Sequence, residues 1–117
     1  MKCSVQISEL EAIAVCRCAG RIESARDASH LTQTMQPALE SGKNVVLDLS
    51  GVAALDSVGI LELVLIHMRA RAAGCDVSIA GAPNWLQDML RMSNVAALFE
   101  IHQTVQEAIS SLSRQVA

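Results

Sequence analysis

The residues best placed to support chemistry are Asp56 and Ser57, which stand directly before a long apolar segment without proline. Asp56 is a good helix N-cap, so Ser57 and Val58 are predicted to lie in the first helical turn. A hydroxyl there lies beside unpaired backbone N–H groups and the positive end of the helix dipole. That environment suits a phosphate group, which adds a charge of roughly −1.5 to −2. An ordinary capping hydroxyl is the alternative interpretation of Ser57.

Enzymatic chemistry at Ser57 would require a base within hydrogen-bond reach. His67 lies ten residues further along the same predicted helix, which is about 15 Å away at the helical rise. His30 and His102 have no acidic residue at a spacing that would orient them. There is no GxSxG elbow, no Walker loop and no paired-carboxylate spacing. We therefore expect the chain not to be an enzyme and to have no cofactor.

Four cysteines, Cys3, Cys16, Cys18 and Cys75, raise the question of disulfides or a metal site. Cys16 and Cys18 would share one side of a strand, but no CxxC or paired-histidine spacing supplies further ligands. We expect reduced thiols packed in the core, and no metal.

Length and composition indicate one domain spanning residues 1–117, with an aliphatic core. The net charge of −3 and only two aromatic residues, Trp85 and Phe99, argue against direct nucleic-acid binding. The longest apolar run, residues 60–68, is interrupted by Glu62 and His67 and is too short for a membrane span. The first residues do not resemble a signal peptide, so a cytoplasmic location is predicted.

Alternation and capping signals predict the order strand, strand, helix, strand, helix, strand, helix, short strand, helix. The first two strands should form an antiparallel hairpin, with Gly20 ending the second. Pro37 should kink or break the first helix near Met35, and Ser50-Gly51 should end the third strand. The expected ranges are Ser4–Ile7, Ala12–Ala19, a helix capped by Ser24, Val45–Leu49, a helix capped by Asp56, Asp76–Ala80, Asn84–Met92, Leu98–Ile101, and a helix capped by Thr104.

The helix after Asp56 is apolar on most of its surface. We expect Leu61, Val64, Leu65 and Met68 to face the sheet, Ile60 and Leu63 to lie toward its edges, and Ile66 to share a side with Glu62 and Arg69. An exposed apolar strip there would suit a partner or a dimer contact. Burial under a neighbouring helix is the other possibility.

With these elements in place, the chain resembles the STAS domain family, and within it the bacterial anti-sigma factor antagonists. The resemblance is carried by residues 45–52 (VVLDLSGV), residues 55–60 (LDSVGI) and the Gly20 turn, with further matches at Gly74, Ala82-Pro83 and residues 98–108. It implies an α/β fold, a mixed sheet of four to five strands with about four helices packed mainly on one face. This agrees with the predicted order of elements.

The resemblance also implies a partner switch. In such antagonists the serine after the aspartate is phosphorylated by an anti-sigma factor that is itself a serine kinase, and a PP2C-type phosphatase resets the system. The acceptor here would be Ser57. The implied partner-binding residues are Glu23, Asp56, Ser57, Val58, Gly59 and Ile60. Gly59 would allow close approach at the helix start.

The chain departs from the family pattern at two positions. Val58 stands where many antagonists have serine or threonine, and Glu23 stands where many have aspartate. Two other outputs known among STAS domains stay open: a soluble subunit that binds the ATPase of a phospholipid-transport ABC system, and a scaffold in a stressosome-like assembly. An intact acceptor serine favours the regulator over the transport subunit.

Overall fold

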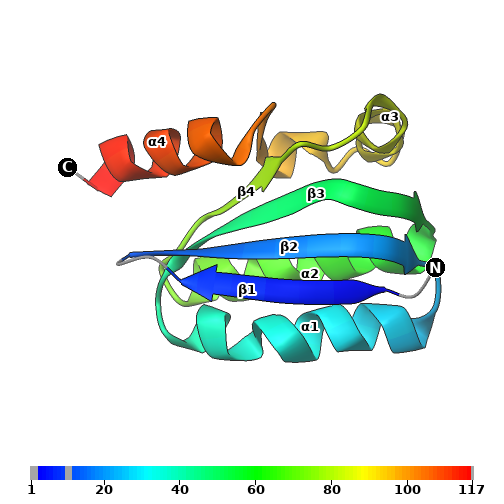
Figure 1. Ribbon diagram of the computed structural model, residues 1–117, viewed down its shortest axis with the longest axis horizontal. Coiled ribbons are helices and arrows are strands. Elements are labelled where there is room, and N and C mark those ends of the chain that lie inside the picture. The colour runs from blue at the N-terminus through cyan, green and yellow to red at the C-terminus, as the bar shows by residue number, and fades with distance from the viewer. Residues whose placement is uncertain (1–2, 10–11, 117) are drawn as a thin grey trace.

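The computed structural model of the protein describes residues 3–9 and 12–116, with side chains as far as Leu112. Its elements follow the predicted order, with one additional 3₁₀ turn, and they confirm the α/β class (Figure 1). In chain order they are β1 (Ser4–Glu9), β2 (Ile13–Ile22), α1 (Ala25–Glu40), β3 (Asn44–Leu55), α2 (Ser57–Ala72), β4 (Val77–Ala80), α3 (Asn84–Met92), the 3₁₀ turn η1 (Ala96–Leu98), β5 (Glu100–His102) and α4 (Val105–Val116).

The five strands form a single mixed sheet in the order β1-β2-β3-β4-β5. β1 and β2 pair antiparallel, which confirms the predicted hairpin, although the centre of its turn lies outside the described residues. All other neighbouring strands pair in parallel. Because parallel strands point the same way, the carboxyl ends of β2, β3, β4 and β5 meet at one edge of the sheet.

The helices cover the two faces of the sheet unequally, as predicted. α1, α2 and α3 contribute to one large apolar cluster through Leu31, Met35, Leu63, Ile66, Leu86 and Leu90, which pack with Cys16, Leu47 and Ile79 of the sheet. α4 covers part of the other face, where Ala108 and Leu112 pack on Val15 and Val46. β3 is therefore buried on both faces, which explains its run of consecutive apolar residues.

The predicted ends of the second and third strands are wrong, and Leu98, predicted to begin the last strand, lies in η1 instead. β2 continues through Gly20, which has a φ of 88°, and ends at Ile22. β3 continues through Ser50 and Gly51 and ends at Leu55. The two strands stay paired because β3 accommodates extra residues at two irregularities, one between Arg17 and Ala19 of β2 and one between Gly20 and Arg21. A glycine inside a strand marks a bulge more reliably than an end.

The predicted disruption at Pro37 is also wrong as far as a break is concerned, because α1 is one continuous helix to Glu40. Proline leaves the carbonyl of Gln33 without its helical partner. Both Pro37 and Gln33 are exposed, so water can satisfy that carbonyl. The helix ends about one turn after Pro37, at Ser41-Gly42 as predicted.

The predicted orientation of α2 is wrong. Its buried residues are Gly59, Ile60, Leu63, Ile66 and Ala70. Leu61 and Met68, which were expected to face the sheet, have 57 % and 58 % of their surface exposed, and Val64 and Leu65 are only half-buried. No helix among the described residues is long and apolar enough to cross a membrane.

Gly59 explains which side of α2 faces the core. A Cβ at this position would lie 2.5 Å from Leu55 Cδ1, 2.9 Å from Leu55 Cγ and 3.1 Å from the Ile22 carbonyl oxygen. The first turn of α2 therefore packs against the ends of β2 and β3 more closely than any residue with a side chain allows. This close approach turns the Gly59 side of the helix toward the core.

Gly59→Ala should destabilise the protein by about 1–3 kcal/mol, because the added methyl group overpacks this contact. The sign of this change in stability is informative, because replacing glycine by alanine in a helix without a steric conflict would stabilise the protein by up to about 1 kcal/mol. Urea unfolding followed by circular dichroism measures the difference, with Ser57→Ala, an exposed position in the same turn, as the control. A Gly59→Ala variant more stable than the wild type would contradict the close approach.

Candidate functional site

The candidate site forms where β2 and β3 end side by side. Ile22 and Leu55 are paired in the parallel register, and the Asp56 N–H donates to the Ile22 carbonyl at 3.3 Å. The residues that follow these strands, Glu23 and Asp56, are thus brought to the same edge of the sheet, at the starts of α1 and α2 (Figure 1). Sequence reasoning selected both residues, but only the strand pairing shows that they are neighbours.

Asp56 caps α2 as predicted. Its backbone is extended, with φ −109° and ψ −173°, and its Oδ1 accepts a hydrogen bond from the Gly59 N–H at 3.0 Å. The carboxylate thus satisfies one of the amides that have no partner within the helix. Its negative charge also lies at the positive end of the helix dipole.

Ser57 is the first residue of α2, and its side chain is exposed. Within the part of the chain that the structure describes, its hydroxyl makes no hydrogen bond. The capping role belongs to Asp56, so Ser57 is not needed for that purpose. An exposed, unengaged hydroxyl at a helix start is accessible to a modifying enzyme and lies where a phosphate is electrostatically tolerated.

The other predicted partner-binding residues divide into exposed and buried ones. Val58 is 39 % exposed and continues the accessible surface beside Ser57. Gly59 and Ile60 are buried, so their side of the helix packs inside the protein and supports the site from within. The surface accessible to a binding partner consists of Glu23, the half-buried Asp56, Ser57 and Val58.

Glu23 is engaged with a residue that the sequence analysis did not select, Arg21. The Arg21 Nε donates to Glu23 Oε1, and this hydrogen bond, with the attraction between the two charges, raises the pKa of Arg21. The Glu23 N–H in turn donates to Asp27 Oδ2 at 3.2 Å, while Ser24 caps α1 by accepting from the Asp27 N–H at 3.2 Å. Glu23 is therefore fixed by two contacts, one from its side chain to Arg21 and one from its backbone N–H to Asp27. Extending the predicted strand through Gly20 to Ile22 would have identified Arg21, because it then stands two residues before Glu23 at the strand end, where its side chain can reach the Glu23 carboxylate.

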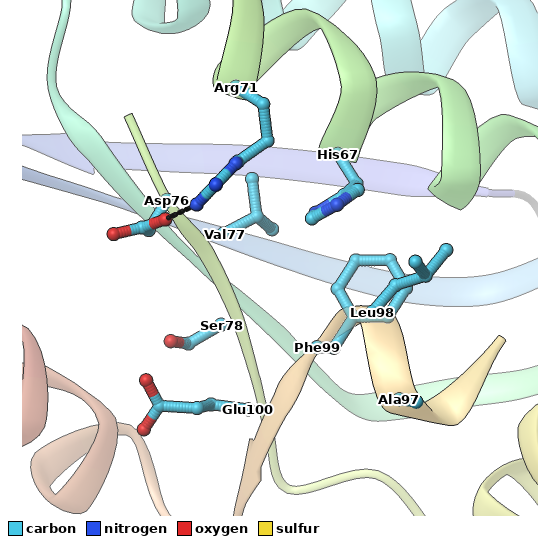
Figure 2. Close-up of a pocket in the computed structure, with 9 residues that line it drawn as sticks. All are labelled: His67, Arg71, Asp76, Val77, Ser78, Ala97, Leu98, Phe99 and Glu100. Atoms are coloured by element: carbon cyan, nitrogen blue, oxygen red, sulfur yellow. Dashed lines mark hydrogen bonds and ion pairs between the residues drawn. The ribbon is translucent and has the colours of Figure 1, made fainter. Parts of the chain in front are cut away.

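A second set of polar residues surrounds a pocket near the far end of α2 (Figure 2). The His67 ring packs edge-on against Phe99, with centroids 5.4 Å apart, and Arg71 Nη1 donates to Asp76 Oδ1 at 2.9 Å. The buried His67 Nδ1 has no hydrogen-bond partner among the described residues. His67 thus points toward Phe99 at the far end of the helix from Ser57, so it cannot serve as a base for that hydroxyl.

The expectation that His102 lacks a nearby acid is wrong. His102 Nε2 lies 3.3 Å from Glu100 Oε1, because the two residues share one face of β5. The same carboxylate oxygen accepts from the Ser111 hydroxyl at 2.9 Å. The orientation of the His102 ring does not allow a hydrogen bond between Nε2 and Oε1. These residues connect β5 with α4, away from Ser57.

The cysteine pair packs as predicted. Cys16 and Cys18 lie on one face of β2 in the main core, with their Sγ atoms 3.9 Å apart, and both are free thiols. The hydrogen bond with Cys16, together with burial, raises the pKa of the Cys18 thiol well above its usual value. A buried thiol in this protonated state is a poor nucleophile.

Comparison with known proteins gives one family match that covers most of the chain. The family model described as "Mlab, STAS domain" matches residues 6–106. Among solved structures, an anti-sigma factor antagonist from Mycobacterium paratuberculosis aligns with a TM-score of 0.80 at 18 % identity, covering 94 % of this chain and 93 % of the other. The anti-sigma factor antagonist SpoIIAA in its unphosphorylated form aligns at 0.79 and 13 % identity, covering 94 % and 96 %.

The same fold also occurs within a much larger protein. The murine anion transporter Solute Carrier 26 family member A9 aligns with a TM-score of 0.78 at 15 % identity, over 94 % of this chain and 19 % of the transporter chain. At these identities the likeness establishes the fold alone. The function must be argued from the site.

Asp56→Ala should lower the free energy of unfolding by about 1 kcal/mol, because the Gly59 N–H loses its acceptor and the helix start loses a favourable charge. Asp56→Asn should retain most of the stability, since its amide oxygen can accept the same bond. Chemical denaturation of the two variants beside the wild type makes the comparison. Equal loss in both variants would show that the charge, and not the hydrogen bond, dominates.

Proposed function

The chain belongs to the STAS domain family, and from this premise we propose that it is an anti-sigma factor antagonist in a phosphorylation-controlled partner switch. In its unmodified form it binds an anti-sigma factor that is a serine kinase, and this frees a sigma factor. The kinase transfers the γ-phosphoryl group of ATP to Ser57 Oγ, with loss of the hydroxyl proton and release of ADP. A PP2C-type phosphatase hydrolyses the phosphoester and restores the hydroxyl.

The observation that supports this proposal is the position of Ser57. Its hydroxyl is exposed, has no hydrogen bond within the described residues and stands at the first position of α2, while Asp56 performs the capping. A serine there can gain a phosphate without rearrangement of the fold, because the free first-turn amides partly neutralise the added charge. The chain is then a substrate and binding partner in the cytoplasm, and not itself an enzyme.

The fold tolerates a phosphate on Ser57, but the same phosphate should weaken the binding of a partner. A partner surface that fits a bare hydroxyl would meet three acceptor oxygens and about two negative charges, next to the carboxylate of Asp56. A loss of roughly 3–4 kcal/mol of binding free energy weakens an interface by a few hundredfold, which is enough for a switch.

Glu23 and Val58 define the rest of the proposed contact surface. Glu23 adds a second carboxylate, held in place by Arg21, at the edge of the sheet where Ser57 lies. Val58 offers an apolar contact beside the acceptor. This edge carries the carboxylates of Glu23 and Asp56, the guanidinium of Arg21 and the apolar Val58, so it would suit a partly apolar partner surface with charges of both signs.

A second candidate function is a soluble subunit that binds the ATPase of a phospholipid-transport ABC system. One observation favours keeping it: the family model that matches residues 6–106 is described as Mlab. In that case the same exposed surface around Ser57 would serve as a permanent docking face. Phosphorylation would not be required.

The test uses the wild-type protein with a purified anti-sigma factor serine kinase from the same organism. Incubation with ATP, followed by mass mapping, should place one phosphate on Ser57. In binding assays with the kinase, Ser57→Ala should bind as tightly as the unmodified wild type, whereas Ser57→Asp should bind at least about a hundredfold more weakly. Glu23→Gln is expected to weaken binding without preventing phosphorylation.

Equal affinities of Ser57→Asp and wild type, or a phosphate on another residue, would overturn the partner switch. Binding to a transport ATPase that is unaffected by Ser57→Asp would instead support the second function.

A further inference from the structure

Arg21 and Glu23 form an exposed ion pair at the edge of the sheet where the candidate site lies. The Arg21 Nε donates to Glu23 Oε1, and 53 % of the Arg21 side chain and 41 % of the Glu23 side chain are exposed. The last two residues of β2, Arg21 and Ile22, pair with Ala54 and Leu55 at the end of β3. The ion pair therefore stands beside the strand end that leads into α2.

The fold itself gains little from this pair. An ion pair between exposed side chains adds little to stability, because water screens the attraction and two long side chains lose conformational freedom. Glu23 is also not needed to cap α1, since Ser24 performs that role by accepting from the Asp27 N–H. The main effect of the pair is to restrict the Glu23 carboxylate, whose own backbone is already bound to Asp27 Oδ2.

We propose that Arg21 is a positioning residue for the partner-binding surface, which holds the Glu23 carboxylate in the orientation that the partner binds. This role depends on the proposed function, since it concerns the same surface. A side chain that is ordered before binding loses less conformational entropy on association, and this strengthens the complex. Arg21 binds Oε1 and so leaves Oε2 for a hydrogen-bond donor of the partner.

The expected effect of Arg21 is on binding and not on folding. Ordering one flexible side chain in advance changes an affinity by about threefold to tenfold. Removing the guanidinium should weaken the partner complex by this factor and leave the stability of the protein nearly unchanged. If Arg21 acts through Glu23, its removal should have no further effect once the Glu23 carboxylate is absent.

The test measures the affinity of the unphosphorylated full chain for the anti-sigma factor serine kinase by isothermal titration calorimetry, in a double-mutant cycle. Arg21→Gln should weaken binding about threefold to tenfold. Arg21→Lys should recover part of this loss, because an ammonium group can still donate to the carboxylate. In a Glu23→Ala background, the change Arg21→Gln should leave the affinity unaltered.

The control variant is Arg91→Gln, which removes a comparable exposed ion pair, that with Asp88 on α3. It should bind as tightly as the wild type. Chemical denaturation of each variant establishes that it is folded, so a loss of affinity reports on the binding surface.

An Arg21→Gln variant that binds as tightly as the wild type would overturn the positioning role. An equal loss from Arg21→Gln with and without the Glu23 carboxylate would also overturn it, and would show that Arg21 contacts the partner directly. A wild type that does not bind the kinase would instead overturn the proposed function on which this role depends.

Discussion

The structure depends on one close contact, the packing of the first turn of α2 against the ends of β2 and β3. Gly59 permits it, because any side chain there would collide with Leu55 and the Ile22 carbonyl. The Asp56 N–H bonds to the same carbonyl, and the Asp56 carboxylate caps the helix that follows. Contacts among Ile22, Leu55, Asp56 and Gly59 thus join the ends of two strands to one helix.

This contact determines what is exposed at the site. With Gly59 facing inward and Asp56 engaged in capping, Ser57 has no structural task and faces outward. Because β2 and β3 run parallel and end together, Glu23 reaches the same edge. The site is therefore an edge held by strand pairing and by the Asp56 cap, at which the Ser57 hydroxyl is exposed. A group added to this hydroxyl need not disturb the fold.

The same contact leaves the opposite side of α2 uncovered. Turning Gly59 and Leu63 into the core necessarily turns Leu61 and Met68 outward, since the helix places them on the other side. Two exposed surfaces, the edge around Ser57 and the apolar outer side of α2, thus arise from one helix orientation. They adjoin at Val58, so whatever binds one affects access to the other.

The sequence by itself determined the order of the elements, the caps at Ser24, Asp56 and Thr104, and the position of Ser57 at a helix start. These features depend on residues within about four positions of each other, so local spacing predicts them. Only the tertiary structure decided how far β3 extends and which side of α2 is buried. β3 passes Ser50-Gly51 because its pairing with β2 tolerates two irregularities, and α2 is apolar on every side, so its periodicity selects no face. Both outcomes depend on neighbours distant in the chain, which local patterns do not contain.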